Sequence, residues 1–163
     1  MERVFRAMIK FYSGDPHQIQ HFTKVHSYAR LIGISEKLDD EVQLILGIAA
    51  IVQDIGIKPA LEKHGSGSGK CQEIEGPPVA EEMLAGLGYP KHIIDRVCYL
   101  VGHHHTYTHI AGLDYQILVE ADFLVNMFES TMDDSTIKST LEKLFRTHTG
   151  KEYCRLMYAV IMD

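Results

Sequence analysis

Apolar residues recur every three or four positions along almost the whole chain, which is the spacing of amphipathic α-helices. The first such segment, residues 2–12, places Val4, Phe5, Met8 and Ile9 on one helical face. The alternation of period two that indicates a half-buried β-strand is almost absent. The pattern therefore predicts an all-α fold.

Two acidic helix-start signals set the limits of the next segments. Asp15 is followed by Pro16, and a capping side chain before a proline at the first helical position favours a helix over residues 15–38. A third helix is expected over residues 40–55, after a pair of aspartates. Residues 44–52 are apolar on all sides, which predicts the buried central helix of the domain.

Five further helices are expected in the second half of the chain. They cover residues 77–87 (opened by Pro77 and Pro78), 90–105, 114–128, 134–147 and 151–162. The Gly- and Ser-rich segment 64–70 before them predicts a mobile loop. Together these segments predict a single all-α bundle of about seven to eight helices over residues 1–163, with the C-terminal helices 134–162 packed on the rest.

Composition narrows the classes of function. The chain has 16 basic and 22 acidic residues and a net charge of −6, which argues against a surface for duplex nucleic acid. The longest apolar run, residues 44–52, is too short to cross a bilayer, and the N-terminus lacks the apolar core of a signal peptide. We therefore expect no membrane partner and a cytoplasmic protein. Three cysteines without a C-x-x-C pair support neither a disulfide framework nor a zinc ribbon.

Four polar residues interrupt the apolar stripes of four different predicted helices. These residues are His21, Asp54, His104 and Asp122. Burying an unpaired carboxylate costs several kcal/mol, so a cation must offset the two aspartates. That cation is either a protonated histidine or a metal ion. A His/Asp set without a thiolate suits one or two divalent ions of Mn, Fe, Mg or Zn.

The same residues resemble the H…HD…D signature of the HD superfamily of metal-dependent phosphohydrolases. The segment HFTKVHSYARLIG places His21 at the first ligand position, AAIVQDIGIK supplies Asp54, and ILVEADFLVN supplies Asp122. The resemblance covers about residues 15–130. It implies an HD/phosphodiesterase-like helical bundle with metal ligands at these three residues.

The resemblance also implies further ligands. The segment VGHHHT is similar to the paired histidine of two-metal members, which adds His103 and His104. Glu75 is a weak candidate in the region where such members carry another histidine. The histidine of the HD doublet is replaced by Gln53, whose amide oxygen is a weaker ligand. A metal with fewer strong ligands, a metal shifted toward the histidine pair and Asp122, and no metal all stay open.

Several functions are compatible with these residues. The first is a metal-dependent phosphohydrolase that acts on a nucleotide or other small phosphate ester through metal-activated water. In it Asp54 bridges the ions or orients the water. Lys58 and Lys70 either neutralise phosphate oxygens or stay solvated at the surface. The alternative is an HD-like domain without catalysis that binds a small-molecule ligand or a metal. A di-iron oxygenase is a further option within the same superfamily. The C-terminal helices leave a homodimer open.

Overall fold

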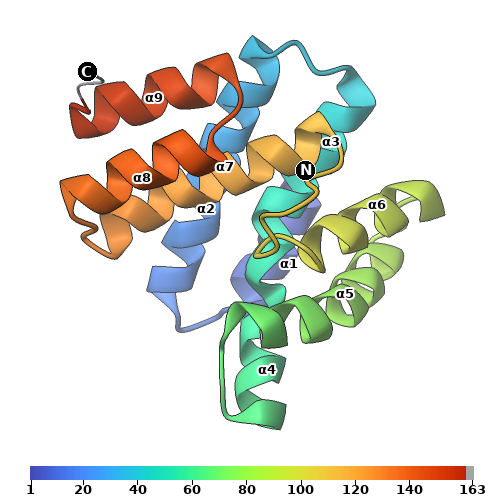
Figure 1. Cartoon of the computed structure of the whole chain (residues 1–163). Coiled ribbons are helices and arrows are strands. Elements are labelled where there is room, and N and C mark those ends of the chain that lie inside the picture. Colours follow the sequence, from blue (N-terminus) through green and yellow to red (C-terminus); the bar gives the residue numbers. More distant parts are fainter. Residues whose placement is uncertain (161–163) are drawn as a thin grey trace.

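The computed structural model describes residues 1–160, and all regular elements in that range are helical (Figure 1). The elements are α1 (Glu2–Phe11), α2 (Pro16–Ser35), α3 (Asp40–Val52), the 3-10 helix η1 (Gln53–Gly56), α4 (Ile57–His64), α5 (Gly69–Gly86), α6 (Lys91–Val101), α7 (Leu113–Glu129), α8 (Asp134–Leu144) and α9 (His148–Tyr158). The predicted all-α class is confirmed. The described range contains one helix more than the seven to eight expected, because α4 is separate from α3.

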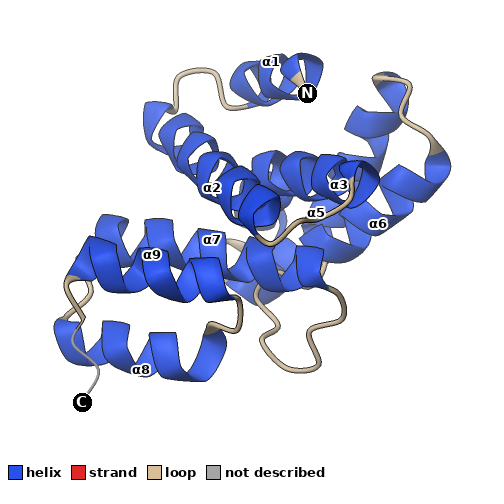
Figure 2. Ribbon diagram, turned by 90° about the horizontal axis from the view of Figure 1, so that it is seen from above, coloured by secondary structure: helices blue, strands red, loops and turns tan. Residues whose placement is uncertain are grey.

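The helices α2, α3 and α7 form the centre of the bundle (Figure 1). Helix α3 packs against both of the others, and its residues 45–52 are buried, as the apolar pattern predicted. Helices α5 and α6 lie on one side of this centre, and α8 and α9 lie on the other (Figure 2). The turn η1, which continues α3, packs against α5 and α6.

The acidic helix-start signals act as predicted. The side chain of Asp15 accepts a hydrogen bond from the backbone N–H of Gln18, and Asp39 does the same for Val42. Each bond satisfies one of the N–H groups that a helix leaves free in its first turn. The start of α2, which carries His21, is therefore fixed by local sequence.

The prediction that Pro77 and Pro78 open a helix is wrong. Both prolines lie inside α5, which begins eight residues earlier, and the predicted loop 64–70 shrinks accordingly. The reason is tertiary packing. At Gly56 in η1 a Cβ atom would come within 2.5 Å of the Gln72 carbonyl oxygen of α5. This close backbone contact supports the helix ahead of the prolines, although each proline removes one helical hydrogen bond.

Two predicted helix ends also differ from the structure. The third helix stops at Val52 instead of continuing to residue 55, because the chain tightens into η1. The last two predicted helices correspond to α8 and α9, and α9 ends at Tyr158. Residues 161 and 162 of the predicted final helix lie outside the described residues.

The helical stretch Asp40–His64 is long and apolar enough to cross a membrane when only length and composition are considered. It contains the apolar run 44–52 together with its helical flanks. In the structure 72% of its most apolar window is buried inside the fold. That burial is the property of a core helix, which is the role the sequence predicted for it.

Candidate metal centre

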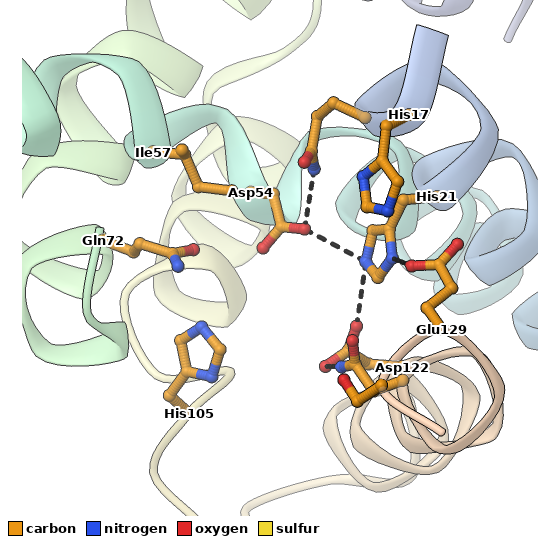
Figure 3. Close-up of a pocket in the computed structure, with 11 residues that line it drawn as sticks. His17, His21, Asp54, Ile57, Gln72, His105, Asp122 and Glu129 are labelled. Carbon is orange, nitrogen blue, oxygen red and sulfur yellow. Dashed lines mark hydrogen bonds and ion pairs between the residues drawn. The ribbon is translucent and has the colours of Figure 1, made fainter. Parts of the chain in front are cut away.

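The three signature residues meet in the structure, although they come from three separate elements. His21 lies on α2, Asp54 on η1 and Asp122 on α7 (Figure 3). His21 Nε2 is 3.1 Å from Asp54 Oδ2 and 3.2 Å from Asp122 Oδ1, and all three side chains are buried. Ligand atoms about 2.0–2.2 Å from one divalent ion lie roughly 3 Å from one another. Each of the two distances to His21 Nε2 therefore fits a pair of neighbouring ligands as well as an ion pair.

Contacts from α1 and α2 fix the position of Asp54. The hydroxyl of Tyr12 donates a hydrogen bond to the Asp54 carbonyl at 2.6 Å, and Gln18 Nε2 donates to Asp54 Oδ2 at 2.9 Å. The tight turn of η1 follows directly on the buried end of α3. The carboxylate is thus held at the end of the central helix, where it faces α2 and the turn after α6.

Glu129, which sequence reasoning missed, orients the His21 ring. His21 Nδ1 donates a hydrogen bond to Glu129 Oε2 at 2.7 Å, and the other carboxylate oxygen pairs with Lys24 Nζ. The ring therefore presents Nε2 to the two aspartates. Metal-ligating histidines commonly have such a carboxylate partner on the second nitrogen. Glu129 lies seven residues after Asp122 on α7, which is two helical turns along the same face. This spacing could have identified Glu129 from the sequence.

Gln53 occupies the position of the missing histidine. Its Nε2 donates a hydrogen bond to Asp122 Oδ1 at 2.7 Å and lies 3.5 Å from His21 Nε2. Its Oε1 is buried without a hydrogen-bond partner among residues 1–160. In this orientation the amide supplies a donor to the aspartate. A rotation of the amide by 180° would exchange the donor for an oxygen that can act as a ligand.

A second set of possible ligands faces the other oxygen of Asp54. His104 Nε2 lies 3.4 Å from Asp54 Oδ1, and ligand atoms of Asp54, His104 and His105 lie within 4.8 Å of one another. His104 Nδ1 donates to the Val101 carbonyl, which leaves Nε2 as the free acceptor. The Nε2 atoms of both histidines are buried and lack a hydrogen-bond partner in the described part of the chain. Such unpaired buried nitrogens beside a carboxylate suit a cation.

The structure places His103 outside this cluster. Its Nδ1 donates to the Tyr99 carbonyl at 2.7 Å, and its ring stacks on the Tyr99 ring at 4.2 Å between centroids. The adjacent pair near Asp54 is His104 and His105, not His103 and His104. The difference arises because α6 ends at Val101, so helical spacing no longer describes the following turn. Glu73 accepts hydrogen bonds from the backbone N–H of His105 and the hydroxyl of Thr106, which fixes that turn.

Three other predicted site residues lie away from the cluster. Lys58 Nζ donates to the Phe11 carbonyl and lies 4.8 Å from the centroid of the Tyr12 ring. Lys70 is exposed in the first turn of α5. Glu75 pairs with Lys63 and His64 of α4. The predicted loop 64–70 is reduced to residues 65–68, and Lys70 belongs to α5.

A cavity of about 240 Å³ opens over the cluster (Figure 3). Its lining residues are His17, Gln18, His21, Asp54, Ile57, Gln72, His105, Asp122, Asn126, Glu129 and Ser130. The lining contains three carboxylates and, among the described residues, neither lysine nor arginine. Asn126 Nδ2 donates to Asp122 Oδ2 at 2.7 Å. His17, one helical turn before His21, was not predicted, because it lies in the first turn of α2 beyond the apolar stripe.

The charges of the cluster depend on one another. Burial disfavours the imidazolium of His21, but its hydrogen bonds to Asp122 and Asp54 outweigh burial and raise its pKa from 6.5 to about 11. For Asp54, burial opposes ionisation, but the neighbouring imidazoles of His104 and His21 hold its pKa well below the usual range. Burial, together with the charge of His104, lowers the pKa of His105. Without a metal, protonated His21 offsets the aspartates, and a metal must displace that proton.

No protein-family model matches the sequence, and no curated protein matches it. The structure is similar to the crystal structure of a predicted HD superfamily hydrolase from an uncultured Thermotogales bacterium. The TM-score is 0.70 and the sequence identity is 22%, and the match covers 98% of this chain and 85% of the other. At this identity the similarity establishes the fold. The chain therefore shares the helical fold of that structure, which agrees with the fold that the signature resemblance implied.

Proposed function

We propose that this protein is a metal-dependent phosphohydrolase that acts on a small phosphate ester in the cavity over His21, Asp54 and Asp122. The observation that carries the proposal is the position of Asp54. One oxygen of its carboxylate faces His21, and the other faces His104, so it lies between two groups of nitrogen donors. A carboxylate in this position can bridge two divalent ions, which is an arrangement used in phosphoryl transfer.

The donor set supports a hard or borderline divalent ion. The candidate ligands are imidazole nitrogens and carboxylate oxygens, and no cysteine lies among the residues of the cavity lining. Buried nitrogens without partners at His104 and His105 also fit a cation. When bound, such an ion lowers the pKa of a water ligand to about 7 and polarises a phosphoryl oxygen.

The chain's own residues would orient the ligands and hold the substrate. Gln18 and Asn126 fix the carboxylates of Asp54 and Asp122 through the hydrogen bonds described above. His17, at the cavity wall, is placed to contact the substrate and to give a proton to its leaving group. Lys58 and Lys70 lie outside the lining, so they are not expected to neutralise phosphate there.

Replacement of the two aspartates tests this function. Asp54→Asn and Asp122→Asn keep the side-chain shape but remove a charged ligand, so each is expected to lower kcat/KM about 100-fold or more with Mn²⁺. Hydrolysis of p-nitrophenyl phosphate and of a nucleotide panel measures the effect. Asp95→Asn, at an exposed aspartate on α6, is the matched control. Unchanged activity in both site variants would refute the proposal.

The second candidate function is an HD-like domain without catalysis, and the position of Gln53 favours it. Its amide already donates a hydrogen bond to Asp122 in the place where a ligand would act. Elemental analysis after incubation with Mn²⁺ or Zn²⁺, followed by the same hydrolysis panel, separates the two functions. Bound metal without hydrolysis supports the second candidate.

Gln53→His separates the two functions further. If Gln53 is what weakens the site, the variant is expected to bind Zn²⁺ at least tenfold more tightly, because an imidazole replaces an amide. Isothermal titration measures the affinity, and Gln43→His, in the first turns of α3, is the control. Equal affinity in wild type and Gln53→His would show that this position does not limit metal binding.

A further inference from the structure

A second polar cavity, of about 320 Å³, lies where the loop after α6 meets the start of α7 and the end of α8. Its lining residues are Tyr107, His109, Ile110, Gln116, Lys143, Leu144 and Arg146. Two cationic side chains, Lys143 and Arg146, therefore line this cavity together with the hydroxyl of Tyr107. Among the described residues no carboxylate takes part in the lining.

The guanidinium of Arg146 is fixed by the end of α8. Its Nη1 donates hydrogen bonds to the carbonyls of Glu142 and Phe145, and its Nη2 donates to the carbonyl of Lys143. A guanidinium has five N–H donors, so the Nε–H and one Nη2–H are left without a partner in the range 1–160. These two donors are available to oxygens of a phosphate or carboxylate.

Lys143 adds a second positive charge without a counter-charge. Neither side chain forms an ion pair among residues 1–160, although the backbone N–H of Arg146 donates a hydrogen bond to the buried carboxylate of Glu120. The whole chain carries a net charge of −6, so carboxylates are abundant elsewhere on it. Both side chains are exposed, so water screens their mutual repulsion, and an anion between them would lower it further. The cavity therefore offers two cations to an anionic group.

The metal centre has the opposite character. Its cavity is lined by the carboxylates of Asp54, Asp122 and Glu129. Tyr107 connects the two cavities, because its hydroxyl lies 3.4 Å from His105 Nδ1 and its ring packs against Phe123, the residue after Asp122. A ligand with two anionic groups would find divalent ions for one group at the metal centre and the cationic cavity for the other.

We propose that the cavity of Lys143 and Arg146 is a second phosphate-binding subsite, which holds a distal phosphate of the substrate while the scissile phosphate lies over the metal centre. The substrate class is then a nucleotide or other ester that carries at least two phosphate groups. The substrate part of this inference rests on the proposed phosphohydrolase function. The binding of phosphate to the cavity does not, because it needs no bound metal.

The first experiment titrates metal-free protein with inorganic pyrophosphate and follows backbone amide shifts of residues 107–110 and 143–147 by NMR. Saturable shifts are expected in the wild type. Lys143→Met is expected to weaken binding about tenfold, and Arg146→Lys, which keeps the charge but removes the fork, about threefold or more. Lys151→Met removes the same charge from α9, outside the lining, and is expected to bind normally. Equal binding in Lys143→Met and Lys151→Met would overturn the proposal.

The second experiment compares a nucleoside bisphosphate with the matching monophosphate as substrates in the presence of Mn²⁺. Lys143→Met is expected to raise KM for the bisphosphate about tenfold and to leave both constants for the monophosphate unchanged. An unchanged KM for the bisphosphate would overturn the assignment to the substrate. If neither compound is hydrolysed by the wild type, the proposed function fails, while the phosphate site is still decided by the pyrophosphate titration.

Discussion

His21 is held through both of its ring nitrogens. Glu129 accepts from Nδ1, and Nε2 faces Asp54 and Asp122. The carboxylate on Nδ1 fixes the tautomer and strengthens Nε2 as a donor to a metal. At the scale of single residues, the properties of the centre therefore depend on side chains that do not touch the ion.

Replacement of Glu129 tests that dependence. Glu129→Gln keeps the shape of the side chain but removes its charge, and we expect it to weaken Mn²⁺ binding about 10–100-fold. Isothermal titration of the metal-free protein measures the change. Glu142→Gln on the outer side of α8 is the control and should bind as the wild type does. An affinity of Glu129→Gln equal to that of the control would mean that Glu129 does not act through His21.

The raised pKa of His21 predicts a pH dependence of stability in metal-free protein. The pKa is about 11 in the folded state and about 6.5 in the unfolded state, so protonation stabilises the fold fully below pH 6.5. This contribution is lost as the pH rises from about 6.5 toward 11, at up to about 1.4 kcal/mol per pH unit. The difference in unfolding free energy between wild type and His21→Gln should thus shrink with rising pH. Urea titrations in the presence of a chelator measure it, and a difference that grows with pH would contradict the argument.

At the scale of elements, the contact between η1 and α5 sets the position of Asp54. Gly56 allows the two backbones to approach, since a Cβ there would lie 2.5 Å from a backbone oxygen and 2.9 Å from the nitrogen of Gly76. Backbone atoms cannot rotate away as the end of a flexible side chain can. The position therefore requires glycine for reasons of space, without any unusual backbone angle.

Gly56→Ala is expected to lower the unfolding free energy by about 1–3 kcal/mol, because the added methyl group forces α5 away from η1. Chemical denaturation measures the loss, and metal affinity should fall with it as Asp54 shifts. Gly86→Ala in α5 has no atom within 4 Å of the new Cβ, so it should be neutral or stabilising. A similar change in both variants would show that the contact is not critical.

Predictions about individual helices were wrong where tertiary packing, not local sequence, determines where a helix begins or ends. Pro77 and Pro78 signal a helix start, but the packing of α5 against η1 extends the helix to Gly69. The resemblance added His103 to His104, but α6 ends at Val101 and the turn that follows brings His105, not His103, beside His104 and Asp54. Neither the start of α5 at Gly69 nor the turn after Val101 can be predicted from neighbouring residues alone, since both depend on which elements pack against them.

At the scale of the whole molecule, the centre joins α2, η1 and α7, so metal binding is expected to stabilise the entire fold. Saturation with Mn²⁺ at about 100 times its Kd should add about 2.7 kcal/mol to the unfolding free energy. A thermal shift assay measures this as a rise in Tm. Asp54→Asn should abolish most of the rise, whereas Asp95→Asn should preserve it. Equal shifts in both variants would place the metal elsewhere. The cytoplasmic location and the homodimer stay predictions.

Local spacing was sufficient for the helical class and for three site residues. An imidazole or carboxylate on an apolar helical stripe points to the core wherever the neighbouring helices lie, so His21, Asp54 and Asp122 could be found from the sequence. The partner of His21 Nδ1, the place of His105 beside Asp54 and the cationic cavity at Arg146 follow from how separate helices pack. Such contacts join residues far apart in the chain, and their geometry is set by turns and close backbone approaches that periodicity does not record.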